Sequence, residues 1–145
     1  EAPAGHRVDI ELLVTHGCKG SPVKEVRVKI PEEIESTRPH HDHDWDIEMK
    51  MRPLDEPRTG EGGVVITEVV DEIIWKNPKR KMPDNMYESF RFRALMPNEP
   101  GKILFFRSIN VCDEGEEPYV DLMLTCGKWS SASTIRNSPT RHGSS

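Results

Sequence analysis

The chain has 145 residues and a mass of 16.6 kDa, a length typical of one domain. Hydrophobic residues account for 34% and charged residues for 31%, as in globular proteins, while twelve prolines and ten glycines argue against a helical bundle. The formal net charge of −5 counts against a nucleic-acid-binding protein. No apolar run approaches the ~18 residues of a membrane-spanning helix, so we expect no membrane span in this chain.

Apolar and polar residues alternate along most of the chain, with the period of two that is typical of β-strands. We expect strands over residues 8–14, 26–30, 45–51, 64–75, 90–94, 103–106 and 120–126. Turns rich in Gly, Pro and Asn separate them. About seven to nine short strands with such turns predict an all-β fold, an antiparallel β-sandwich of the immunoglobulin or cupredoxin type.

Three of these strands carry more specific expectations. The alternation places Trp45, Ile47, Met49 and Met51 on one apolar face of their strand, and a buried indole is the default for Trp45. The β-branched segment 64–75 is long enough for one bent strand or two. The segment 103–106 is apolar on both faces, which is typical of a central strand.

The composition changes at Trp129, after which the chain is rich in Ser and Thr and nearly free of apolar residues. We therefore expect one domain over residues 1–128 and a tail or linker over residues 129–145. The chain begins with Glu1 rather than Met, and we expect that a signal peptide has been removed.

Three cysteines, Cys18, Cys112 and Cys126, are widely spaced and form no CxxC pair, which excludes a zinc knuckle and a thioredoxin motif. An odd count allows one disulfide and one free thiol. Cys126 falls with the apolar positions of its strand, so a buried free thiol is its expected state. A disulfide would indicate an oxidising compartment.

The densest group of metal-binding side chains is the segment 39–44, which contains His40, His41 and His43 together with Asp42 and Asp44. Imidazoles and carboxylates are ligands for divalent copper, nickel or zinc. On a strand, His41 and His43 would face the same side and could share one ion. The alternative is a hydrated, pH-sensitive loop with adventitious metal affinity. Neither a Ser-His-Asp or Cys-His signature nor a Gly-rich phosphate loop is present, and we expect that the chain is not an enzyme.

Six segments in order carry a resemblance to a known family. They are Glu1–Gly5, His16–Pro22, Val26–Glu32, Arg38-Pro39 with Trp45, Val69–Trp75 and Met82–Arg93. The last of these matches a Leu-Pro-Asp-Asp-Phe-Tyr-Asp-Glu-Phe pattern most closely. Over about residues 1–126 the chain resembles the YcnI-like copper-binding domain of bacterial secreted and membrane-anchored proteins. The resemblance implies a β-sandwich and, because Cys112 falls on the family's second cysteine, a Cys18–Cys112 disulfide.

The resemblance also implies a copper site of the histidine-brace type. In that site the mature N-terminal His supplies its α-amine and imidazole to Cu(II), with a strand Glu and a Trp nearby. The corresponding His would lie several residues before Glu1, so we expect the brace to be incomplete in this chain. The family's carboxylate aligns near Arg27, which makes Glu25 its nearest equivalent, and the family's Trp falls at Tyr119.

Two functions follow from these observations. The first is an extracytoplasmic copper-binding or copper-handling protein, secreted, periplasmic or at the cell surface, with Cu(II) as its cofactor and a copper-trafficking partner. The second is a secreted β-sandwich recognition module that has lost the metal site. Because function is located in a site and not in a fold, the resemblance alone does not choose between them.

Overall fold

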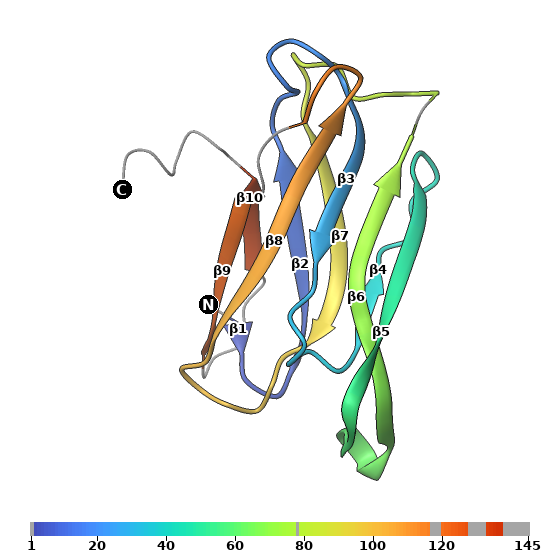
Figure 1. The fold of residues 1–145 in the computed structure, drawn as a ribbon. Helices are drawn as coiled ribbons and strands as arrows, with labels where there is room; N and C mark the ends of the chain where they lie inside the picture. The colour runs from blue at the N-terminus through green and yellow to red at the C-terminus, as the bar shows by residue number, and fades with distance from the viewer. Residues whose placement is uncertain (1, 78, 117–119, 128–132, 138–145) are drawn as a thin grey trace.

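A computed structural model describes residues 2–77, 79–116, 120–127 and 133–137, with side chains for 4–77, 79–116 and 122–125. These residues form ten strands and one short 3-10 turn, arranged as two sheets packed face to face (Figure 1). The strands are β1 (Ala2–Pro3), β2 (Arg7–Val14), β3 (Val23–Lys29), β4 (Thr37–Pro39), β5 (Asp46–Thr59), β6 (Val65–Lys76), β7 (Glu88–Leu95), β8 (Ile103–Cys112), β9 (Val120–Gly127) and β10 (Ser133–Asn137), and η1 (Glu61–Gly63) joins β5 to β6.

One sheet has the strand order β1-β9-β8-β3-β6-β5 and the other β10-β2-β7-β4. All neighbouring strands are antiparallel except β1 with β9 and β10 with β2, which run parallel. The prediction of an all-β, mainly antiparallel sandwich is therefore confirmed. None of the helices among the described residues is long and apolar enough to cross a membrane.

The core between the sheets is built from the inward faces that alternation predicts. Val8, Ile10, Leu12 and Val14 of β2 are each at most 5% exposed. Across the interface, aromatic rings meet: Trp45 and Trp75 lie 5.1 Å and 5.2 Å from Phe90, measured between ring centroids. Such contacts contribute roughly 0.5–1.5 kcal/mol beyond the burial of their area. The expected burial of Trp45 is confirmed.

The β5–β6 hairpin departs from its predicted pattern. Segment 64–75 is a single strand, β6, with a bulge, and it pairs with a β5 that is much longer than the strand expected there. The far end of the hairpin extends past the sandwich (Figure 1). Met49 and Met51 lie on β5, the edge strand of the sheet, and are 47% and 48% exposed, although they pair with the buried Ile73 and Val70 of β6. Pro53 and Pro57 fit this edge strand, where a missing N–H breaks no ladder on the open side. Alternation placed the two methionines on one face but could not predict whether another layer covers it.

The expectation that residues 103–106 are buried on both faces is wrong for one face. β8 does lie inside its sheet, between β9 and β3. However, Ile103 and Phe105 are 47% and 58% exposed, whereas Leu104 and Phe106 are buried. No second layer of described residues covers the outer face of this sheet, so only the inward face of β8 is in the core.

Part of the predicted tail belongs to the four-stranded sheet. Ser133–Asn137 forms β10, which pairs in parallel with β2 from Ile10 to Val14. The prediction of a tail from residue 129 onward therefore does not hold for these five residues. The open edge of β2 offers unpaired backbone groups, and a Thr-Ile segment has the β propensity to use them. The remainder of the tail, and the side chain of Cys126, lie outside the described residues.

Candidate metal centre

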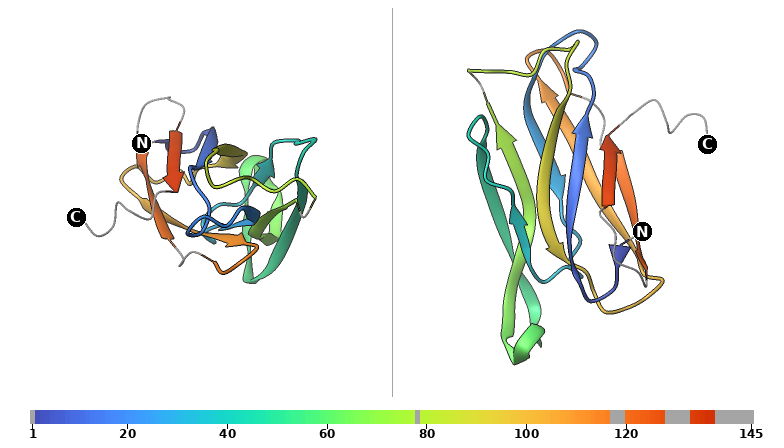
Figure 2. Two further views of the ribbon diagram at one scale, coloured as in Figure 1. Left: turned by 90° about the horizontal axis from the view of Figure 1, so that it is seen from above. Right: turned by 180° about the vertical axis from the view of Figure 1, so that it is seen from behind.

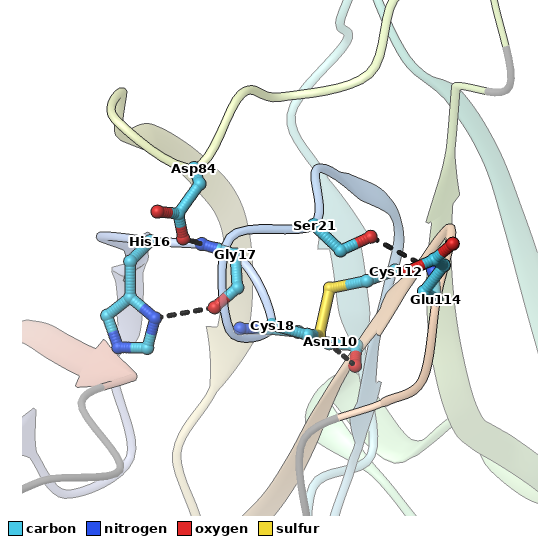
Figure 3. Close-up of a disulfide and its surroundings, with 8 residues drawn as sticks. All are labelled: His16, Gly17, Cys18, Ser21, Asp84, Asn110, Cys112 and Glu114. Carbon is cyan, nitrogen blue, oxygen red and sulfur yellow. Dashed lines mark hydrogen bonds between the residues drawn. A yellow bond between two sulfur atoms is a disulfide. The ribbon is translucent and has the colours of Figure 1, made fainter.

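One end of the sandwich is fastened by a disulfide between Cys18 and Cys112, with an S–S distance of 2.01 Å (Figure 3). This confirms the pairing that the family resemblance implied. The bond joins the loop after β2 to the end of β8, and therefore links the two sheets. It closes a separation of 94 residues. In the chain-entropy model such a long loop corresponds to about 4–5 kcal/mol of stabilisation.

Hydrogen bonds fix the conformation of the loop that carries Cys18. Cys18 and Ser21 exchange two backbone hydrogen bonds of 3.0 Å, and the N–H of Gly17 donates to Asp84 Oδ1 at 2.9 Å (Figure 3). A Cβ on Gly17 would lie 1.9 Å from the carbonyl oxygen of Ser21, so only glycine fits there. Sequence reasoning did not single out Asp84, although it lies in the segment with the closest family match.

The predicted histidine cluster divides into two parts in the structure. The rings of His41 and His43 lie edge to face with centroids 4.7 Å apart, and both side chains are exposed. His40 instead follows the end of β4, where its N–H donates to the carbonyl of Arg91 at 2.8 Å, and its side chain lines a separate cleft with arginines. Within the described part of the chain, no group of three or more His, Cys, Asp or Glu is placed to hold a metal ion. The structure thus brings together two of the three predicted imidazoles.

The aspartates beside these histidines shape the loop. Asp42 Oδ1 accepts the N–H groups of Asp44 at 2.8 Å and of Trp45 at 3.3 Å, which makes an Asx turn. Asp44 Oδ1 accepts from Arg80 Nη1 at 3.3 Å, and its carbonyl accepts the side-chain amide of Asn77. The turn fixes the backbone between the two imidazoles, so His41 and His43 are oriented by the local sequence.

Glu88, which sequence reasoning missed, adds negative charge at this loop. Burial raises the pKa of the Glu88 carboxyl, and the charges of Asp42 and Asp44 raise it further, against a hydrogen bond with Trp45 that lowers it. Glu88 therefore lies close enough to Asp42 and Asp44 for their negative charges to act on it. An available signal was the position of Glu88 in the segment with the closest family match.

Of the residues that the family resemblance placed near a copper brace, the structure describes only Glu25. Glu25 lies on β3 opposite Lys76 of β6, and its carboxylate is in a salt bridge with the guanidinium of Arg27. A metal ion would have to compete with that guanidinium for the carboxylate. The other two family positions, Glu1 and Tyr119, lie outside the described residues.

Comparison with protein families gives one match, "Domain of unknown function (DUF1775)", over residues 1–132. The chain belongs to the DUF1775 family. YcnI-like copper-binding domains are members of this family, so the resemblance seen in the sequence is confirmed. No curated protein matches the chain significantly.

Two solved structures resemble this member of the family. An uncharacterized protein from Nocardia farcinica with an immunoglobulin-like fold aligns with a TM-score of 0.63 and 12% identity, over 87% of this chain and 92% of that one. A putative membrane anchored protein from Corynebacterium diphtheriae aligns with a TM-score of 0.37 and 9% identity, over 96% of this chain and 38% of that one. The first match shows that the sandwich is immunoglobulin-like.

Proposed function

We propose that this DUF1775 domain is an extracytoplasmic copper-handling module in which His41 and His43 bind Cu(II). The observation that carries the proposal is the placement of the two imidazoles, 4.7 Å apart between ring centroids, on a turn fixed by Asp42. Neutral imidazole is a preferred ligand of divalent copper. The carboxylates around the turn favour a cation there through their negative charge.

The fit of this group to copper rests on donor chemistry. The two exposed imidazoles would supply nitrogen ligands to a copper ion at this loop. Such a site would hold copper and pass it on. On this proposal the domain is not an enzyme.

The extracytoplasmic location is supported by the disulfide between Cys18 and Cys112. Structural disulfides persist in oxidising compartments and are rare in the cytosol. A copper-handling protein outside the reducing cytosol would meet Cu(II), the ion that imidazoles favour.

The strand register gives a second place where copper could bind. β1 runs parallel to β9 with Ala2 beside Cys126, so a segment that continued β1 upstream would run toward Val120. A histidine about five residues ahead of Glu1 would then lie level with Val120, which pairs with Ser108 of β8. That is the half of the sheet in which Glu25 lies, one strand beyond β8.

A Cu(II) titration followed by calorimetry and paramagnetic resonance tests the proposal. We expect the His41→Ala/His43→Ala variant to lose tight binding, whereas His6→Ala, an exposed histidine outside the loop, leaves the affinity unchanged. Binding that survives the double substitution would refute the assignment to the loop. An extended protein that restores an upstream histidine then shows whether the site lies at β1.

The alternative function, a recognition module without metal, is favoured by one specific observation. Ile103, Phe105 and Met123 form an exposed apolar stripe on the outer face of β8 and β9, with Phe105 and Met123 directly opposite each other. Exposed apolar clusters often mark contact surfaces. Absence of copper binding in both the present and the extended protein would make this alternative the better description.

A further inference from the structure

The outer face of the four-stranded sheet contains a cleft of about 260 Å³ over β2, β7 and β4. The right-hand view of Figure 2 looks onto this sheet. The charged side chains in the lining are Asp9, Arg38, Arg91 and Arg93, and His40 lies beside them. Three arginines against one aspartate give the cleft a net positive charge, although the whole chain carries −5.

Strand register concentrates these arginines. Arg38 of β4 lies directly opposite Arg93 of β7, and Asp9 of β2 lies on the other side of Arg93. Like charges that face each other across a ladder are destabilising. Asp9 is already bonded to Arg93, with its Oδ1 accepting from Nε at 2.7 Å. The repulsion between Arg38 and Arg93 is therefore only partly offset within the sheet.

Two of the arginines have no acidic partner among the described residues. Arg91 is opposite Glu11 in the ladder, but no ion pair or side-chain hydrogen bond between described residues holds the guanidinium of Arg91 or of Arg38. Both side chains are exposed. Their donors are thus available to a ligand that enters the cleft.

Backbone pairing and electrostatics both place the cations close together. The N–H of His40 donates to the carbonyl of Arg91, which brings the end of β4 against β7 at the cleft. The hydrogen bond from Arg93 lowers the pKa of the Asp9 carboxyl, burial opposes this, and the charges of Arg93 and Arg91 lower the pKa further. Two cations therefore act on one point of this face.

We propose that this cleft is a phosphate-binding site, in which Arg38 and Arg91 are the principal donors. A guanidinium presents a rigid fork of N–H groups that matches the oxygens of a phosphate two at a time. The volume is smaller than the ~300–1,000 Å³ of pockets for drug-sized ligands, which suits inorganic phosphate or a small phosphomonoester. This site is separate from the proposed copper ligands, because His40 lines the cleft and His41 and His43 do not.

The test is a titration with inorganic phosphate, followed by NMR shifts or calorimetry at constant ionic strength with NaCl as the balancing salt. Arg38→Gln and Arg91→Gln should each weaken binding by about fivefold or more, as expected for the loss of charge-assisted hydrogen bonds. Arg7→Gln is the matched control, since it removes a cation from the same sheet that is already paired with Glu61 at 2.9 Å. All three substituted side chains are exposed, and thermal melting verifies that each variant is folded.

Equal weakening by all three substitutions, or no saturable binding of phosphate, would overturn the proposal, because either result indicates only a general ionic effect. A parallel titration with glycerol 3-phosphate distinguishes the two sources of the group. Tighter binding of glycerol 3-phosphate assigns the cleft to phosphomonoesters, whereas tighter binding of inorganic phosphate assigns it to the free ion.

Discussion

The outer faces of the two sheets carry similar residues but differ in which of their charged side chains form ion pairs. On the six-stranded sheet, several cations have a neighbouring acid: Asp71 lies 3.6 Å from Lys29 and 3.7 Å from Arg52, and Lys76 lies 3.2 Å from Glu48. On the four-stranded sheet, Arg93 has Asp9, while Arg38 and Arg91 have no such partner among the described residues.

The difference arises from ion pairing and not from composition. Both sheets place like charges opposite each other, Arg38 with Arg93 on one and Lys29 with Arg107 on the other. On the six-stranded sheet Lys29 also forms an ion pair with Asp71, whereas on the four-stranded sheet Arg38 has no ion pair among the described residues. Each exposed ion pair contributes only about 0–1 kcal/mol, but an arginine without one keeps its donors available to an anion from outside.

The largest effect that we expect concerns the disulfide, which links the two sheets. Cys18→Ser/Cys112→Ser should lower the free energy of unfolding by about 2–5 kcal/mol, measured by denaturant titration. Phosphate binding should persist in conditions where the variant is folded, because the arginines lie on strands that the bond does not join. Thiol counting on the denatured, unreduced wild-type protein should give one free thiol, and a count of three would contradict the bridge.

A smaller effect is expected from Asp9→Asn, which removes the one acid from the arginine cleft. Since the pKa of Asp9 is lowered in the folded state, its contribution to stability is present at neutral pH and is lost as the pH falls below about 3.9 toward the folded value. The variant should therefore be less stable than wild type at neutral pH and equal to it in strong acid. Its phosphate affinity should rise; a fall would mean that Asp9 positions Arg93 more than it neutralises it.

The smallest effect is expected at Glu88, beside the loop that carries His41 and His43. Because the pKa of Glu88 is raised, the carboxyl favours the folded state while protonated, and this contribution is lost as the pH rises through the folded value. Glu88→Gln stays neutral, so it should unfold at a slightly higher temperature than wild type at pH 7 and at the same temperature below about pH 4. Glu116→Gln, an exposed carboxylate, is the control. A lower melting temperature for Glu88→Gln at pH 7 would contradict the sign.

The candidate sites could be predicted only in part. The histidine cluster was visible in the sequence. The rings of His41 and His43 do lie next to each other, but on a bend between β4 and β5 and not on the strand that the spacing argument assumed. The separation of His40 from this pair was not visible, because it depends on a backbone bond to Arg91, far away in the chain. The arginine cleft was missed for the same reason, since Arg38 and Arg93 meet only through strand pairing.

By itself, the sequence determined the alternating strands, the sandwich and the burial of Trp45, because the side-chain period of a strand is a local property. The motif order determined the family and, with it, the Cys18–Cys112 pairing. Only the tertiary structure decided which faces are covered, and it left Met49 and Phe105 exposed where alternation had grouped them with apolar residues. It also decided which charges stand opposite one another. Contacts between distant segments decide both which strand faces are buried and which residues pair across neighbouring strands. A local sequence pattern therefore cannot predict either of them.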